Sequence, residues 1–188
     1  ASIQLGGSTD KKAQARVPIT ARLVADLLTA AGADRLLTVD LHAGQIQGFF
    51  NIPVDELTAL PILSDYFKKK EIRDLVGVAV DIGISKKARD VADRMHAPLA
   101  IIEKRRVGND EKTETMNVIG DVEGKVALTF DDEIATGGTM LAATRLIRRI
   151  GAEIVEVAAM IDLPDLGGSR KLQEEGLQVY TVCSFEGD

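Results

Sequence analysis

Residues 126–140 read VALTFDDEIATGGTM: an apolar strand is followed by two acids, a pair of glycines between threonines, and the start of a helix. Glycines let backbone N–H groups come close to an anion, and a helix N-terminus adds partial positive charge. Asp131 and Asp132 repel phosphate, so they should face sugar hydroxyls or a bound metal ion. The stretch therefore predicts a site for a phosphorylated sugar, although such glycines also occur in turns that only pack tightly. The expected substrate-binding residues are Asp131, Asp132, Ala135, Thr136, Gly137, Gly138 and Thr139.

Strand and helix alternate along most of the chain in the same way. Apolar runs without polar alternation indicate strands that are buried on both faces, and amphipathic segments separate them. This pattern predicts an α/β fold with a mostly parallel sheet and helices on both of its faces. Helices are expected at residues 18–31, 57–70, 85–95, 140–150 and 169–175, and strands at residues 35–41, 75–80, 99–103, 115–119, 126–130, 155–161 and 179–182.

Composition narrows the class of protein. The 188 residues are 45% hydrophobic and 28% charged, as in soluble globular proteins, and no apolar run approaches the roughly 18 residues of a membrane span. A net charge of −6 argues against nonspecific nucleic-acid binding, which needs an excess of Lys and Arg. The single cysteine, Cys183, cannot form an internal disulfide, and no signal peptide is recognisable. We therefore expect a cytoplasmic protein with no membrane or nucleic-acid partner.

Two further strand ends carry candidate ligands, because parallel sheets bind ligands at the C-terminal ends of their strands. His42 follows the first expected strand and could hold a metal ion or a phosphate, although a single histidine is more often structural. Asp81 follows the second, where Gly83 permits a turn and Lys86 brings positive charge to a position where pyrophosphate could lie. The alternative is an ordinary turn with surface lysines.

A basic cluster, Lys104-Arg105-Arg106, follows the strand expected at residues 99–103 and leads into a polar loop. Runs of this kind are commonly solvated edges. They can also close over a polyphosphate, because the guanidinium group matches its oxygens in a fork geometry.

These motifs together resemble the phosphoribosyl pyrophosphate synthetases, a family of the type I phosphoribosyltransferase superfamily, over about residues 10–149. In these terms residues 1–9 are a leader, residues 10–56 a synthetase-like N-terminal segment, and residues 57–188 a phosphoribosyltransferase-like core. The matching motifs are Asp10-Lys11-Lys12 with Arg16, residues 18–23, residues 40–55 around His42, Lys104-Arg105-Arg106, residues 118–122 and residues 131–139.

The resemblance implies a type I phosphoribosyltransferase-like fold and transfer of a pyrophosphoryl group from magnesium ATP to the 1-hydroxyl of ribose 5-phosphate. It implies Mg²⁺ as the cofactor, with His42 and Asp81 as residues of the magnesium site. Lys104 and Arg106 correspond to catalytic cations of a mobile loop, and residues 131–139 to the cradle for ribose 5-phosphate or phosphoribosyl pyrophosphate. Assembly into a homo-oligomer is a further expectation.

The chain departs from the synthetase pattern in three places. We expect the half-domain that precedes this region in the family to be absent, and Ser8 and Thr9 stand where an Arg-Gln pair usually contacts the nucleotide, so weak ATP binding is expected. From about residue 150 the tail resembles adenine phosphoribosyltransferases, as in a natural or engineered chimera. Three hypotheses follow: an impaired synthetase, a purine phosphoribosyltransferase that needs no ATP, and a non-catalytic sugar-phosphate-binding protein.

Overall fold

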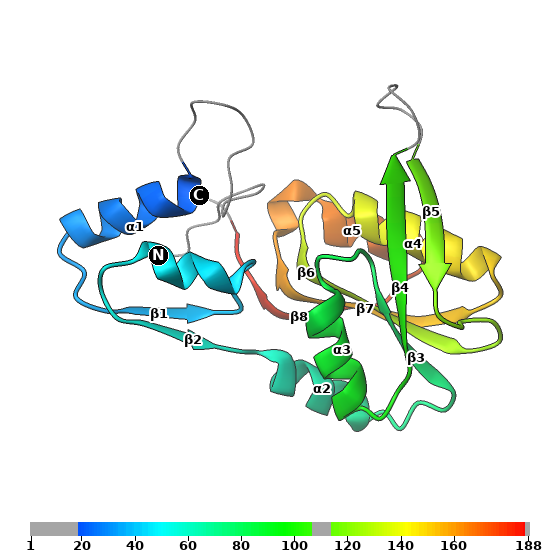
Figure 1. The fold of residues 1–188 in the computed structure, drawn as a ribbon. Helices are drawn as coiled ribbons and strands as arrows, with labels where there is room; N and C mark the ends of the chain where they lie inside the picture. Colours follow the sequence, from blue (N-terminus) through cyan, green and yellow to red (C-terminus); the bar gives the residue numbers. More distant parts are fainter. Residues whose placement is uncertain (1–18, 107–113, 187–188) are drawn as a thin grey trace. The chain divides into compact units, whose positions relative to one another are not determined.

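The computed structural model describes residues 19–106 and 114–186 (Figure 1). The chain divides into two units, Ala1–Thr58 and Ala59–Asp188. Every helix in the described ranges is too short or too polar to span a lipid bilayer.

The first unit is small and contains a two-stranded parallel sheet. Its elements are α1 (Thr20–Ala30), β1 (Leu36–Val39), the 3₁₀ helix η1 (Gly44–Phe49) and β2 (Val54–Leu57). Leu36 of β1 lies opposite Val54 of β2. The expected helix and first strand are present, but β2 was not predicted, because Val-Asp-Glu-Leu is too short and too polar to be recognised as a strand.

The second unit contains a six-stranded sheet with the order β5-β4-β3-β6-β7-β8. All neighbouring strands are parallel except β4 and β5, which pair antiparallel. The chain leaves β3 toward β4 on one side and leaves β6 toward β7 on the other, so the order reverses between β3 and β6. Ligands collect at such a switch point in open α/β sheets. The strands are β3 (Leu75–Ala79), β4 (Leu99–Arg106), β5 (Glu114–Ile119), β6 (Val126–Ile134), β7 (Glu153–Asp162) and β8 (Val179–Ser184).

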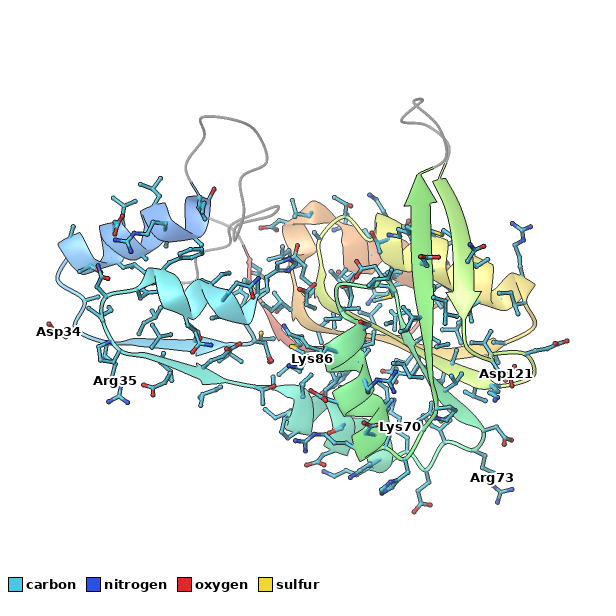
Figure 2. All side chains as sticks on the ribbon, in the orientation of Figure 1. Asp34, Arg35, Lys70, Arg73, Lys86 and Asp121 are labelled. Carbon is cyan, nitrogen blue, oxygen red and sulfur yellow. The ribbon has the colours of Figure 1, made fainter. Side chains whose placement is uncertain are left out.

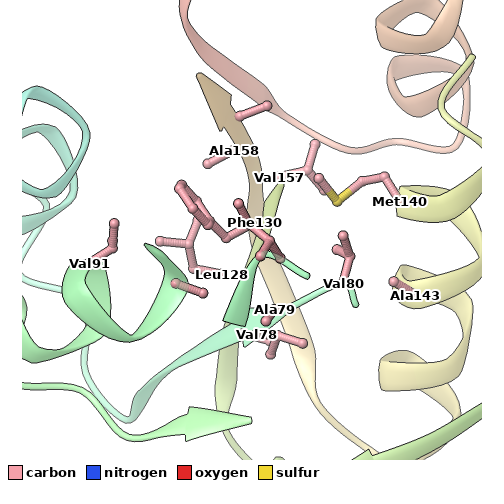
Figure 3. Packing of buried hydrophobic residues seen from close by; sticks show 14 of the residues in the cluster. Val78, Ala79, Val80, Val91, Leu128, Phe130, Met140, Ala143, Val157 and Ala158 are labelled. Carbon is pink, nitrogen blue, oxygen red and sulfur yellow. The ribbon is translucent and has the colours of Figure 1, made fainter. Parts of the chain in front are cut away.

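Helices cover both faces of this sheet, as the sequence predicts. In Figure 3, Val91 of α3 lies on one side of the central strands, while Met140 and Ala143 of α4 lie on the other. The central strands are apolar on both faces, and their buried side chains fill the two resulting cores. The helices are α2 (Leu60–Lys68), α3 (Ser85–Arg94), α4 (Gly138–Arg149) and α5 (Gly168–Glu174), and the short 3₁₀ helix η2 (Pro164–Leu166) precedes α5.

A buried carboxylate joins α2 to the sheet. Glu156 of β7 is only 3% exposed, and it pairs with Lys70, which follows α2 (Figure 2). The Tyr66 hydroxyl donates a second hydrogen bond to this carboxylate, at 3.1 Å. The Tyr66 ring stacks on Tyr180 of β8, with ring centroids 3.6 Å apart. The Lys70 Nζ lies 4.4 Å from the centroid of the same Tyr66 ring, so Tyr66 positions both groups that compensate the buried charge.

Strand β6 is longer than the sequence indicates. It continues beyond Phe130 to Ile134, because this end of the strand keeps pairing with β7, where Ile134 lies opposite Asp162. The acidic pair Asp131 and Asp132 therefore lies in the strand and not in the turn after it. Hydrophobic periodicity alone predicts that the strand ends after Phe130, because polar side chains interrupt the apolar run. Such side chains are tolerated at the C-terminal end of a strand.

Candidate functional site

A pocket of about 200 Å³ lies at the C-terminal end of β6, beside β3, where the strand order reverses. Most of its lining comes from one continuous stretch of sequence, which runs from the end of β6 into the first turn of α4. Asp81, which follows β3, is the contribution from a neighbouring strand. The lining residues are Asp81, Asp131, Asp132, Glu133, Ile134, Ala135, Thr136, Gly137, Gly138, Thr139 and Met140.

The turn between β6 and α4 presents backbone donors to this pocket. Gly137 has a φ angle of +73°, a left-handed conformation that L side chains rarely adopt, and it is the N-cap residue of α4. The first turn of an α-helix leaves N–H groups without partners inside the helix. Gly138, Thr139 and Met140 belong to that turn and line the pocket. The pocket therefore offers backbone N–H groups and the positive end of a helix dipole to an anion.

Carboxylates gather at the other end of the lining. Burial, reinforced by the charge of Asp132 and then of Asp81, raises the pKa of Asp131 to about 8. The backbone N–H of Asp132 donates to Asp131 Oδ1 at 2.9 Å and offsets part of this shift. A carboxyl group held so close to other acids is stabilised by a proton, a cation or hydroxyl donors. This end of the pocket therefore favours cations and hydroxyl donors, and it disfavours phosphate.

The pKa of Asp131 predicts a pH-dependent stability of the ligand-free protein. The folded chain holds a proton on this carboxyl that the unfolded chain releases near pH 3.8, so the stabilising contribution is complete below that pH and is lost as the pH rises through about 8. Asp131→Asn should therefore gain stability relative to the parent between pH 5 and 8, by up to about 1.4 kcal/mol per pH unit. Urea unfolding of both proteins at a series of pH values measures the difference.

A second substitution checks the cause of this shift. The charge of Asp132 contributes to the raised pKa of Asp131, so Asp132→Asn should move the pH dependence to lower pH. If the stability profiles of the parent and Asp131→Asn run parallel between pH 5 and 8, the raised pKa is wrong.

The structure brings Lys104 to the predicted sugar-phosphate residues. Strand β4 extends through Arg106, so both expected loop cations belong to a strand that pairs with β5, with Lys104 opposite Met116. The Lys104 Nζ donates to Thr139 Oγ1 at 3.1 Å. The side chain of Arg106, the polar loop at 107–113 and the Ser8-Thr9 pair lie outside the described residues.

The remaining predicted residues are less closely associated with the pocket. Asp81 lines it, and Asp81 Oδ1 accepts a hydrogen bond from the Ile84 N–H at 3.1 Å, just before α3. Neither Gly83 nor Lys86 is among the described residues that line the pocket, and Lys86 is exposed on the first turn of α3 (Figure 2). His42 is exposed in the first unit, whereas Asp81 belongs to the second, so a shared magnesium site stays a prediction.

Sequence reasoning missed the contribution of α5. The Lys171 Nζ donates to the backbone oxygen of Thr136 at 3.3 Å, and Gly168 packs against the backbone of the turn. The Gly167-Gly168 pair was a usable signal, because glycine has no Cβ atom and therefore permits a close approach to its backbone. The sequence alone does not indicate which backbone it approaches.

The family of the chain follows from comparison with known proteins. Residues 62–179, more than half of the chain, match the model of the phosphoribosyl transferase domain. The chain belongs to the phosphoribosyltransferase family. The pocket lies inside the matched region.

The chain is 52% identical over 177 residues to a ribose-phosphate pyrophosphokinase from Corynebacterium ammoniagenes. The alignment covers 93% of this chain and 55% of that protein. The chain spans about half the length of the curated relatives that it matches. A match that covers 93% of the chain must extend beyond residue 150. The similarity to pyrophosphokinases therefore continues into the tail, where we expected it to stop.

Solved structures of phosphoribosyltransferases and synthetases share the fold. A phosphoribosylpyrophosphate synthetase from Mycobacterium smegmatis superposes with a TM-score of 0.74 at 37% identity, over 93% of this chain and 63% of that one. An adenine phosphoribosyltransferase from Rhodothermus marinus gives a TM-score of 0.56 at 27% identity, over 68% of this chain and 77% of the other. These comparisons confirm the resemblance to the synthetases and the α/β fold of the type I phosphoribosyltransferases.

Proposed function

We propose that the pocket binds ribose 5-phosphate or phosphoribosyl pyrophosphate. The observation that carries this proposal is the division of one pocket into backbone donors at the N-terminus of α4 and carboxylates at the end of β6. A phosphorylated sugar needs donors for its phosphate and acceptors for its ring hydroxyls. In this arrangement the turn at Gly137 and Gly138 holds the 5-phosphate, and Asp131 and Asp132 accept hydrogen bonds from the ribose.

The proposed reaction is a pyrophosphoryl transfer, the reaction after which the pyrophosphokinase relatives are named. The 1-hydroxyl oxygen of ribose 5-phosphate attacks the β-phosphorus of ATP and gives up its proton to solvent, the bond from that phosphorus to the bridging α,β-oxygen breaks, and AMP leaves. Identity of about one half to these relatives supports the assignment. Such a transfer depends mainly on positioning and on cations that stabilise charge on the phosphates. Lys104, held at Thr139, and Arg106 are the proposed cations.

Magnesium is the proposed cofactor, and the pocket suits it. Within residues 19–106 and 114–186, no three His, Cys, Asp or Glu side chains come together as they would around a metal ion. Mg²⁺ does not require such a cage, because it usually binds one or two carboxylates together with substrate phosphates and water. Asp81, Asp131, Asp132 and Glu133 are the acids that line the pocket, and burial, together with the charges of Asp132 and Asp81, raises the pKa of Asp131. Bound Mg²⁺ would neutralise charge on the phosphates.

A purine phosphoribosyltransferase is the second candidate. The structural similarity to an adenine phosphoribosyltransferase at 27% identity favours it. That reaction starts from phosphoribosyl pyrophosphate and a base, releases pyrophosphate and uses no ATP. It would occupy the same pocket with the same end of the sugar.

Separate incubations distinguish the two reactions, since AMP is a product of both. With Mg²⁺, we expect AMP from ATP only when ribose 5-phosphate is present, and no AMP from adenine and phosphoribosyl pyrophosphate. The rate should be low, because Ser8 and Thr9 lack the charge of the pair that synthetases carry there. AMP from adenine and phosphoribosyl pyrophosphate alone would establish the transferase instead.

Binding of ribose 5-phosphate in a calorimeter without AMP from either mixture would indicate a non-catalytic protein. The Gly138→Val variant, purified in parallel, controls for contaminating host enzymes.

A further inference from the structure

The glycine turn rests directly on the backbone of α5. A Cβ atom on Gly168 would lie 2.2 Å from the Ala135 oxygen and 2.7 Å from the Gly137 nitrogen. A Cβ atom on Gly137 would lie 2.8 Å from the Gly168 oxygen. Real Cβ atoms are not found at such distances from backbone atoms, so the two segments touch where neither has a side chain. The start of α5 therefore packs against the backbone of the glycine turn.

Lys171 extends this contact by one turn of the helix. It lies three residues after Gly168, on the same face of α5, and its Nζ donates to the Thr136 oxygen at 3.3 Å. The carbonyl oxygen and the amide hydrogen of a trans peptide point in opposite directions. Holding the Thr136 oxygen toward Lys171 therefore directs the Gly137 N–H away from Lys171. Gly137 itself lines the pocket, so we assign this N–H to a ligand there.

The ammonium group also changes the strength of that donor. A cation on the carbonyl oxygen of a peptide polarises the group and makes its N–H a better donor, as in any chain of hydrogen bonds. The same charge adds to the positive potential of the helix N-terminus. Both effects act on an anion and have little influence on a neutral sugar.

We propose that Lys171 is a positioning residue for the phosphate of the bound sugar. It holds the peptide between Thr136 and Gly137 in the orientation that offers its N–H to the phosphate. This inference rests on the proposed sugar-phosphate site and assigns to α5 a part in its specificity for phosphorylated over unphosphorylated ribose.

The test compares variants of the full chain by calorimetry. Lys171→Met, which keeps the length but loses the charge and the donor, should bind ribose 5-phosphate about ten-fold more weakly, and Lys171→Arg should recover most of the loss. Arg170 is an exposed cation next to Lys171 on the same helix, so Arg170→Gln is the matched control and should change binding less than two-fold. Equal affinity of Lys171→Met and parent, or equal losses in Lys171→Met and Arg170→Gln, would overturn the proposal.

A measurement without ligand separates this inference from the proposed function. In a ¹⁵N-labelled sample, Lys171→Met should shift the amide resonance of Gly137, whereas Arg170→Gln should leave it in place. An unchanged Gly137 resonance in Lys171→Met refutes the positioning role, whatever the protein binds. If the resonance shifts but the parent binds neither ribose 5-phosphate nor phosphoribosyl pyrophosphate, the contact is correct and the proposed function fails.

Discussion

Replacing Gly138 with valine is expected to abolish sugar-phosphate binding while the fold stays intact. Gly138 begins α4 and lines the pocket, in the turn proposed for the phosphate. A Cβ atom there would meet only Thr136 Oγ1, at 3.9 Å, which is ordinary van der Waals contact. The added branches would occupy the pocket without straining the protein. Calorimetry with ribose 5-phosphate should give at least a 100-fold loss, and thermal unfolding should stay within a few degrees of the parent.

Gly137 supplies the contrasting variant. Valine at position 137 would have to adopt a φ angle of +73° and would collide with the Gly168 backbone, so it should lower stability as well as binding. A smaller change, Gly138→Ala, should weaken binding less than valine does. If ribose 5-phosphate binds Gly138→Val as well as it binds the parent, the turn is not the phosphate site.

Changing both Lys104 and Arg106 to alanine is expected to lower turnover by about 100- to 1,000-fold while the affinity for ribose 5-phosphate changes little. Cations that meet charge developing on transferred phosphates contribute mainly to the rate. The Lys104 Nζ donates to Thr139 Oγ1. Thr139 lines the pocket in the first turn of α4, so Lys104 lies next to the turn proposed for the phosphate. AMP release under saturating substrates and calorimetric binding of ribose 5-phosphate measure the two quantities separately.

Lys125 provides a control of the same residue type. It pairs with Asp121 at 2.8 Å, just before the start of β6 and therefore at the opposite end of the strand from the pocket. Lys125→Ala should leave turnover within about two-fold of the parent. Parallel losses of turnover and of ribose 5-phosphate affinity in the double variant would indicate a static phosphate clamp instead.

The alternation of strand and helix in the second unit could be predicted because its signals are local. Strands such as Leu75–Ala79 are continuous apolar runs, and helices such as Ser85–Arg94 carry one apolar face. The pocket was also accessible from sequence, because residues 131–139 supply most of its lining as one continuous stretch. A site built from neighbouring residues needs no knowledge of tertiary packing.

What the sequence did not reveal depends on contacts between distant segments. Gly168 and Lys171 lie about thirty residues after the turn that they touch, and nothing local indicates which backbone α5 approaches. The extension of β6 through its acidic end depends on pairing with β7. The burial of Glu156 likewise depends on Tyr66 and Lys70, some ninety residues earlier in the chain. Each of these features depends on tertiary contacts that hydrophobic periodicity and local motifs do not encode.

The stacked tyrosine pair also determines what optical spectroscopy can report on this protein. The chain has no tryptophan and two tyrosines, and both tyrosines lie in the contact between α2 and β8. Neither tyrosine is among the residues that line the pocket. Intrinsic ultraviolet fluorescence therefore originates from a single place, the packing of α2 on the sheet. The emission intensity will change when that packing is lost during denaturation, and it will change little when a ligand enters the pocket. A tryptophan introduced near the turn would be needed to observe binding by fluorescence.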